Sequence, residues 1–224
     1  MSFTVNKGEH FVLLGSNNSG TSAVIKSLLG LNIPTHGSIR IQNVSDSDLL
    51  NYRSLHGIVG YQPQTCGLDD SLTVTEHLRL FAKLAGCEKS QIELEVTRMI
   101  EACVLLGLEH TIVDSLSHGQ VRRLSLGCAL IGKPPVIILD NPLHGVDPPT
   151  KKALLKTIQK FAEGSTLIVA TRDLKTAQHL GHKIGIMHKG EIVAIGSAGR
   201  IIQTHGQGLT LEVQTCLRRL GKQA

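Results

Sequence analysis

The sequence predicts an α/β protein whose core is a mainly parallel, wound sheet, with antiparallel hairpins and an inserted helical subdomain. Residues 136–139 and 166–171 are continuous apolar runs of the kind found in strands buried on both faces. Segments with helical spacing of apolar residues alternate with such runs, and this alternation is typical of parallel sheets. A purely helical pattern over residues 73–132 separates the two parts of the core.

The composition of the 224-residue chain fits one globular domain of ordinary size, or a core with a smaller insertion. Its content of 41% hydrophobic and 18% charged residues argues against a disordered chain and against a coiled coil. A formal net charge of +5 favours anionic partners such as phosphates or lipid head groups. Only 3% of the residues are aromatic and none is Trp, so we expect no nucleic-acid partner.

The chain carries no sign of a membrane span or of export. No stretch approaches the roughly 18 uninterrupted apolar residues that a spanning helix needs, and the first residues show no signal-peptide pattern. The five cysteines form no close pair, which is typical neither of a metal knuckle nor of a disulfide framework. We therefore expect a reduced, cytosolic setting.

The first part of the chain predicts a hairpin, then a strand, a loop and a helix. Residues 3–5 and 10–14 are apolar runs on either side of a glycine-containing turn, and we expect them to pair. The second run leads into a glycine-rich loop at 15–20 and a helix at 21–30. Two further strands are expected at 37–41 and 57–61. The polar connector between them, at 45–54, is expected to be loop-like or weakly helical.

The middle of the chain predicts helices that begin with capping boxes. Thr73 is followed by Glu76 and Ser90 by Glu93, each pair standing ahead of an apolar helical pattern. A further apolar helix ends near Gly132, where two prolines stop it before the next strand.

The last part of the chain returns to the alternation of strands and helices. Asp147, followed by Pro148, predicts the cap and the first residue of a helix after the first buried strand. After the second buried strand, residues 184–188 and 191–195 flank a lysine–glycine turn and predict a hairpin. Beyond Gly196 we expect only a short tail.

The loop after the first buried run matches the phosphate-loop pattern G-x-x-x-x-G-K-[ST] except at the lysine. Gly15 and Gly20 let backbone N–H groups turn toward a phosphate, and the helix that follows presents its positive end. Ser22 keeps the hydroxyl that binds Mg²⁺ in such loops. Thr21 replaces the lysine, which removes a charge-assisted hydrogen bond worth roughly 1.5–3 kcal/mol. We expect nucleotide affinity about 10–100-fold weaker, although such a loop alone also suits an ordinary strand-to-helix turn.

Further motifs follow the loop in a fixed order. Gln64 comes after a predicted strand, residues 116–120 open a helix, Asp140 ends a buried strand, and Asp147 follows it. This series resembles the ATP-binding cassette (ABC) ATPases over essentially the whole chain. Three segments look more narrowly like the A subfamily, whose members are eukaryotic lipid exporters: 129–140, 145–148 and 208–213.

The resemblance implies ATP and Mg²⁺ as cofactors. In the family's pattern Ser22, Gln64 and Asp140 match the metal-binding positions, and their oxygens suit a hard cation. The positions that match the family's nucleotide-binding motifs are Gly15, Ser16, Asn17, Asn18, Ser19, Gly20, Thr21, Ser22, Ala23, Gln64, Ser117, Gly119, Gln120, Asp140 and Asp147.

Three departures from the family's pattern predict impaired or absent hydrolysis and leave it open whether the chain is an enzyme. Besides Thr21, Asn141 stands where the family has a catalytic carboxylate, and losing a positioned base typically costs about 10²–10⁴ in rate. Arg172 stands where the family has its switch histidine. Its guanidinium either reaches the γ-phosphate and restores part of the lost charge, or is an exposed group paired with Asp173.

ABC cassettes work as head-to-tail pairs in which each ATP lies between one subunit's phosphate loop and the other's signature loop. This chain's signature loop keeps Ser117, Gly119 and Gln120, so it is expected to meet a phosphate bound by a partner. His118 replaces a glycine, and a positive φ there would cost roughly a kcal/mol. The implied partners are a second cassette and the transmembrane domain of a transporter, at the cytosolic face of a membrane.

By this resemblance, residues 1–72 and 133–203 form a RecA-like nucleotide-binding core, 73–132 the helical subdomain and 204–224 a tail. One function is the nucleotide-binding domain of a lipid transporter that binds ATP weakly. The alternative is a non-hydrolysing regulatory cassette that donates its signature loop to an active partner. The family's adenine-stacking aromatic falls upstream of Met1, so either the chain is a fragment or binding lacks a stacking contribution of about 1–3 kcal/mol.

Several other charged residues are expected to lie on the surface without a site of their own. Arg122 and Arg123 are interpreted as solvated charges on the exposed face of a helix. His179 and His182 share a helix face without an acidic or cysteine companion, so we interpret them as surface histidines.

Overall fold

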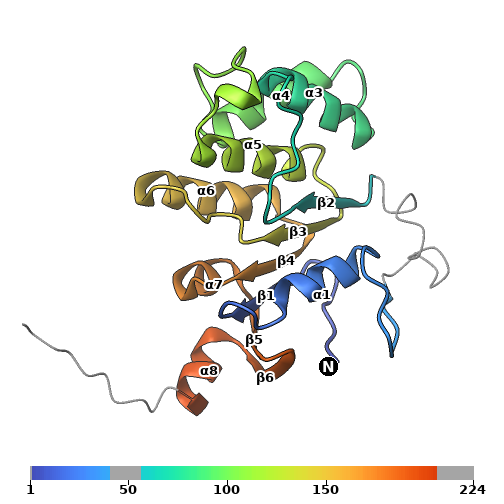
Figure 1. The fold of residues 1–224 in the computed structure, drawn as a ribbon, viewed down its shortest axis with the longest axis vertical. Helices are drawn as coiled ribbons and strands as arrows, with labels where there is room; N and C mark the ends of the chain where they lie inside the picture. The colour runs from blue at the N-terminus through green and yellow to red at the C-terminus, as the bar shows by residue number, and fades with distance from the viewer. Residues whose placement is uncertain (1, 41–56, 206–224) are drawn as a thin grey trace, which may run out of the picture.

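The computed structural model describes residues 2–40 and 57–205, and within them six strands form one sheet in the order β2-β3-β4-β1-β5-β6 (Figure 1). The pairs β2–β3, β3–β4, β4–β1 and β1–β5 are parallel, and only the β5–β6 pair in this sheet is antiparallel. The predicted α/β class with a mainly parallel sheet is confirmed. The strands are β1 (His10–Gly15), β2 (Val59–Gln62), β3 (Val136–Asp140), β4 (Thr166–Thr171), β5 (Lys183–His188) and β6 (Glu191–Gly196).

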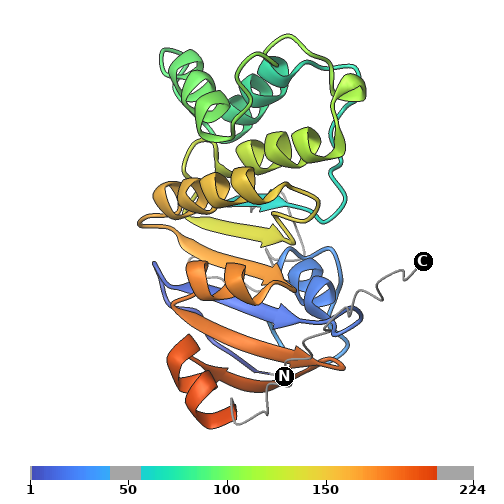
Figure 2. The same ribbon diagram turned by 90° about the vertical axis from the view of Figure 1, so that its left-hand side faces the viewer.

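Helices cover both faces of this sheet, which explains why its central strands are apolar throughout. Figure 1 shows α1 on one side of the sheet, and Figure 2 shows α6 and α7 lying across the other. Beyond β2, helices α3, α4 and α5 form the far end of the molecule. The helices are α1 (Thr21–Leu28), α3 (Val74–Leu84), α4 (Ile92–Ala102), the short 3₁₀ helix η2 (Val113–Ser115), α5 (His118–Leu130), α6 (Pro148–Phe161), α7 (Leu174–Leu180) and α8 (Ala198–His205).

Two apolar layers hold the sheet between these helices. On the α1 side, Ile25 and Leu29 pack against Ile138, Ile168 and Ala170. On the other side one continuous cluster runs from the sheet into the helical end of the molecule. It includes Leu139 and Val169 from the sheet, Leu154 from α6, Leu126 from α5, Leu78 from α3 and Met99 from α4. The helical end is therefore packed onto the sheet rather than tethered beside it.

One of the two predicted capping boxes is present. The Thr73 side chain accepts a hydrogen bond from the Glu76 N–H, and the Glu76 carboxylate accepts one from the Thr73 N–H, so α3 begins as predicted. The box at Ser90 and Glu93 was wrong, because α4 begins at Ile92 after a cap residue whose side chain forms no cap hydrogen bond. The Glu93 carboxylate binds Arg79 of α3 instead, at 2.6 and 2.8 Å.

Three other predicted elements differ from the structure. Residues 3–5 form no strand, because Phe3 stacks on the Phe11 ring, with centroids 5.0 Å apart, instead of entering the ladder. Residues 37–40 are not a strand either, and Ile41 and the connector at 45–54 lie outside the described residues. Where a short tail was predicted after Gly196, α8 forms, because its Ile201 packs against the main apolar cluster.

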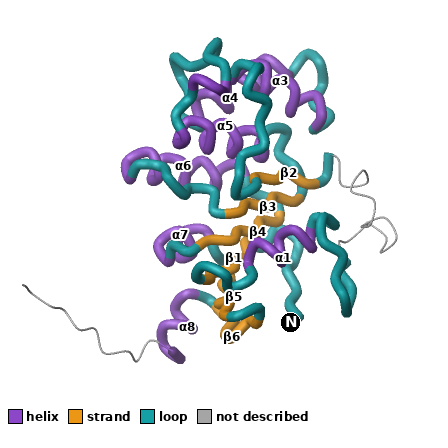
Figure 3. Tube along the Cα trace, viewed as in Figure 1, coloured by secondary structure: helices purple, strands orange, loops and turns teal. Residues whose placement is uncertain are grey.

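Figure 3 colours the helices differently from the strands and shows that the helices are short. Among the described residues, no helix combines the length and the apolar character needed to cross a membrane.

The close approach of β2 to α5 makes Gly60 a test of the packing. A Cβ atom at Gly60 would lie 1.9 Å from the Ala129 carbonyl oxygen and 2.6 Å from Pro134 Cγ. We expect Gly60→Ala to lower the free energy of unfolding by about 1–3 kcal/mol, as other overpacked sites do. Urea unfolding of the chain measures the change. Gly67→Ala is the control, because no atom lies within 4 Å of the added group, and equal stability of the two variants would contradict the prediction.

Candidate functional site

The loop between β1 and α1 has a shape that only glycine permits at two positions. A Cβ at Gly15 would lie 2.2 Å from Ser19 Oγ, so the loop closes directly over Gly15. Gly20 adopts φ 100° at the start of α1, and no side chain caps this helix. The first N–H groups of α1 therefore have no intrahelical partner, and the positive end of the helix is available to an anion.

The outer part of this loop is open, and its inner part holds a polar atom without a partner. Ser16, Asn17 and Asn18 are exposed, whereas Ser19 is only 3% exposed. Within the described part of the chain, Ser19 Oγ makes no hydrogen bond. The Ser19 carbonyl accepts a hydrogen bond of 2.8 Å from the Gly190 N–H in the β5–β6 turn, which supports the loop from below. A small open cradle with an unsatisfied hydroxyl beneath it fits a phosphate group.

Three side chains with oxygen atoms meet beside this loop. Ser22 Oγ, in the first turn of α1, donates to Gln64 Oε1 after β2 at 3.3 Å. Ser22 also lies next to the carboxylate of Asp140, at the end of β3, and hydrogen bonding from Ser22 lowers the pKa of that carboxylate. A hydroxyl, an amide oxygen and a carboxylate are ligands that Mg²⁺ accepts, so the three residues fit the predicted metal site. The structure brings them together from three separate elements.

Asp140 is 2% exposed, and burial raises the pKa of its carboxyl group. Hydrogen bonding from Ser22 and several nearby cations oppose this rise. These cations are Arg122, Lys26 and Arg172.

Asn141 follows Asp140 in a strained turn. Its φ is 49°, a left-handed value that asparagine tolerates, and its N–H donates to the Ala170 carbonyl at 2.8 Å. The Asn141 amide nitrogen donates to Asp140 Oδ1 at 3.3 Å. An amide that donates to the neighbouring carboxylate cannot take a proton from a water molecule.

Arg172 lies exposed at the entry to α7, close enough to Asp140 for its charge to lower that residue's pKa. Of the alternative in which Arg172 is exposed and paired with Asp173, the exposure is confirmed and the pairing is wrong. The Asp173 carboxylate binds Lys151 of α6 and the Thr176 hydroxyl and caps α7. This ion pair ties the start of α6 to the start of α7.

The residues at 117–120 lie apart from the phosphate loop, and no hydrogen bond between described residues joins the two. Ser117 and Gln120 form a capping box at the start of α5. His118 is the first helical residue and its φ is not positive, so the cost that a positive φ would carry does not arise. The His118 ring packs against Gly145, 3.2 Å from where a Cβ would stand. Nearby, Asp147 caps α6 by accepting from the Thr150 N–H at 3.0 Å.

Arg122 contradicts its sequence interpretation, because it is 1% exposed and not a solvated charge. Its guanidinium donates to backbone carbonyls next to the three oxygen-bearing side chains. Gln62 is also fully buried, and its amide nitrogen donates to the Arg122 carbonyl at 3.1 Å. Helical spacing could have indicated this burial from the sequence, since Arg122 shares a face of α5 with the buried residues Leu126 and Ala129.

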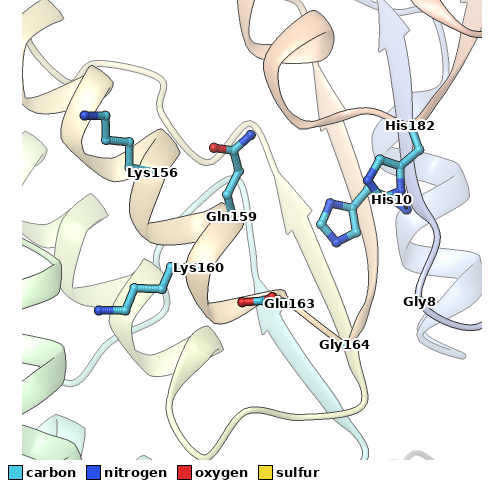
Figure 4. Close-up of a pocket in the computed structure, with 8 residues that line it drawn as sticks. All are labelled: Gly8, His10, Lys156, Gln159, Lys160, Glu163, Gly164 and His182. Atoms are coloured by element: carbon cyan, nitrogen blue, oxygen red, sulfur yellow. Dashed lines mark hydrogen bonds between the residues drawn. The ribbon is translucent and has the colours of Figure 1, made fainter.

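A separate cavity of about 450 Å³ lies at the opposite end of β1 (Figure 4). His10 stacks on His182 there with ring centroids 4.4 Å apart, while Lys156 and Lys160 point away from the histidine pair. Nowhere in the described ranges do three or more His, Cys, Asp or Glu side chains gather as a metal site. Among the described residues, this cavity therefore holds a stacked histidine pair but no cluster of three metal ligands.

Comparison with known proteins agrees with this geometry. The family model described as "ABC transporter" matches residues 1–144. The chain is 34% identical over 214 residues to the glucosylceramide transporter ABCA12 of Homo sapiens, covering 95% of this chain and 8% of the transporter. It is also 34% identical over 209 residues to ABC transporter A family member 9 of Arabidopsis thaliana, covering 93% of this chain and 22% of the relative. The chain thus spans less than a quarter of each relative's length.

Solved structures share the fold. The structure titled as the ATP binding subunit of an ABC transporter has a TM-score of 0.82 at 29% identity, covering 91% of this chain and 85% of that one. A dimeric ATP-binding cassette in a post-hydrolysis state, bound to ADP and Pi, has a TM-score of 0.77 at 23% identity and covers 87% of this chain and 88% of that one.

The ion pair between Lys151 and Asp173 predicts a specific loss of stability in acid. Hydrogen bonds and the charge of Lys151 outweigh burial and lower the pKa of Asp173 to about 2, from an ordinary value of 3.8. A lowered carboxyl pKa stabilises the fold above the ordinary value, and that contribution is lost as the pH falls from about 4 to about 2.

We expect Asp173→Asn to reduce the pH dependence of the unfolding free energy in this window. Chemical unfolding at successive pH values measures it. Asp70→Asn, at an exposed position before α3, is the control. A pH profile of Asp173→Asn that overlays the unmodified chain would contradict the assignment.

Proposed function

The chain belongs to the ABC transporter family as a nucleotide-binding domain of the A-subfamily type, and we propose that it binds ATP with Mg²⁺ weakly and hydrolyses it slowly or not at all. The observation that carries this proposal is the meeting of Ser22, Gln64 and Asp140 beside the uncapped start of α1. When bound, Mg²⁺ would neutralise phosphate charge at these oxygens.

Weak binding follows from what the loop keeps and what it lacks. The glycines at 15 and 20 and the free N–H groups of α1 offer hydrogen bonds to phosphate oxygens. Thr21 offers no positive charge at the position where the motif has lysine. Arg172 is the exposed cation that we propose to supply part of it, because its charge already acts on Asp140.

Slow hydrolysis follows from the turn after β3. Asn141 occupies the position of the general base and presents an amide, which accepts no proton. The same turn holds Asp140 beside Ser22, so the proposed metal position is kept while the proton acceptor is missing. Asp140 is therefore proposed to keep its part in binding Mg²⁺ and ATP, whereas Asn141, the next residue, cannot act as the base in hydrolysis.

The start of α5 favours a second candidate function, in which the chain donates its signature loop to an active cassette. Ser117 is exposed and Gln120 is half-buried, both are preorganised by their capping box, and His118 lies in the helix without strain. The box uses the N–H groups of Ser117 and Gln120 but not those of His118 and Gly119, so this helix start still favours an incoming phosphate. In this alternative the chain pairs head to tail with a competent partner, while its own ATP site stays silent.

We further propose the setting in which this domain works. Residues 1–72 and 133–203 act as the nucleotide-binding core, 73–132 as the helical subdomain and 204–224 as a tail. The domain pairs with a second cassette and serves the transmembrane domain of a transporter at the cytosolic face of a membrane. A lipid cargo is proposed because the human relative is named as a glucosylceramide transporter.

Binding of labelled ATP to the 224-residue chain tests the first proposal. We expect Mg²⁺ to strengthen binding, and Thr21→Lys to raise the affinity by about 10–100-fold, because it restores a charge-assisted hydrogen bond. Ser27→Lys adds the same charge further along α1 and is the matched control. An equal gain in both variants would attribute the effect to net charge and contradict the site.

Steady-state release of phosphate separates the two candidate functions. We expect the double variant Thr21→Lys with Asn141→Glu to exceed the unmodified chain by at least about 10²-fold, since it regains both the phosphate-binding charge and the base. Thr21→Lys with Asn141→Gln is the control, because it lacks the carboxylate. Clear turnover by the unmodified chain would favour the first function, a transporter domain that hydrolyses ATP slowly, whereas turnover only after restoration would favour the donor cassette.

A further inference from the structure

Arg122 places a positive charge inside the protein and surrounds it with backbone carbonyls. Its Nη1 atom donates to the carbonyls of Pro63 at 3.0 Å and Gln64 at 2.5 Å, both in the loop after β2. Its Nη2 atom donates to the carbonyls of Asp140, at 3.2 Å, and Asn141, both in the turn after β3. One guanidinium thus bridges two loops that adjacent parallel strands deliver to the same edge of the sheet.

A buried charge of this kind costs free energy, and what it can provide in return is a fixed geometry. Burying a charge carries a desolvation penalty of several kcal/mol, and carbonyl dipoles offset it less fully than a bound carboxylate would. Nε of Arg122 also remains without a partner within the described residues. Arginine differs from lysine here in shape. The planar guanidinium holds two acceptors at Nη1 and two at Nη2, at fixed separation. An ammonium group is a single point and cannot span both loops.

The two bridged loops carry two of the three oxygen-bearing side chains of the proposed metal site. Gln64 supplies its own carbonyl to Arg122 and its side-chain oxygen to Ser22. Asp140 likewise gives its carbonyl to Arg122 and its carboxylate to Ser22. The distance between Gln64 Oε1 and the Asp140 carboxylate therefore depends on the guanidinium behind them.

We propose that Arg122 is a positioning residue that sets the spacing of Gln64 and Asp140 for Mg²⁺, without itself touching the metal or the nucleotide. This inference rests on the proposed ATP and Mg²⁺ site. It adds a residue that supports that site from α5, the helix that Ser117 caps.

The test compares Arg122→Lys with Arg123→Lys in the 224-residue chain. Arg123 is the next residue of α5 and donates only to the Val104 carbonyl among its described contacts, so it is the matched control. For each variant, the affinity for labelled ATP is measured with and without Mg²⁺. We expect Arg122→Lys to reduce the Mg²⁺-dependent gain in affinity by about 10-fold, the lower end for residues that support metal ligands. Affinity without Mg²⁺ stays within about twofold, because the phosphate loop lies on other elements.

The outcomes separate this inference from the proposed function. A Mg²⁺-dependent gain that Arg122→Lys leaves unchanged would overturn the positioning role and leave the proposed function standing. An equal loss of affinity with and without Mg²⁺ would also overturn it, since a merely structural role weakens both. Absence of ATP binding by the unmodified chain would overturn the proposed function and the metal part of this inference together.

A second measurement tests the bridge without nucleotide. Cys66 is a half-buried free thiol in the loop after β2, and its Sγ lies 3.6 Å from Nη1 of Arg122. We expect Arg122→Lys to accelerate the reaction of Cys66 with a maleimide several-fold, because the loop loses its anchor. Cys87, a half-buried thiol after α3, is the internal control when peptides are assigned by mass spectrometry. An unchanged rate at Cys66 would overturn the bridge.

Should Arg122→Lys fail to fold, Arg122→Gln is used in both assays. It removes the buried charge and its penalty, and its amide still contacts one loop at most. The same two results, a reduced Mg²⁺-dependent gain and a faster Cys66, support the proposal. Their absence in a folded Arg122→Gln protein overturns it.

Discussion

The register of the parallel strands is the constraint on which every other feature of the site depends. β1 and β4 pair Leu14 with Thr171, β4 and β3 pair Ala170 with Asp140, and β3 and β2 pair Leu139 with Gln62. These pairings end the four strands at one edge, so loops far apart in the sequence leave the sheet side by side. A shift of one residue would turn Asp140 to the opposite face, and the buried apolar faces prevent that shift.

Local signals in the sequence were sufficient for the elements that depend on local physics. Continuous apolar runs became the buried strands, and the capping residues Thr73 and Asp147 begin helices where the pattern indicated. The glycine loop and the order of Gln64 and Asp140 were also readable, because each follows directly from a strand end. What the sequence leaves open there is only how closely the side chains approach.

The failures came from partners that the local sequence pattern does not indicate. Glu93 does not close a capping box because Arg79, on another helix, offers it a bidentate contact. Phe3 stays out of the ladder because an aromatic ring is available to stack on. From the sequence, Arg122 is interpreted as a surface charge, because the carbonyls that accept its hydrogen bonds belong to two loops that only the fold brings around it. No periodicity encodes such long-range acceptors.

The hydrogen bond from Gly190 to Ser19 makes the phosphate loop depend on a turn far along the chain. The phosphate loop stands near the start of the chain, yet the turn that supports it belongs to the last hairpin of the sheet. During synthesis the loop leaves the ribosome long before that turn exists, and domains acquire their final packing only when such distant segments arrive. A nascent chain that is cut short before the hairpin would therefore lack this hydrogen bond to the phosphate loop.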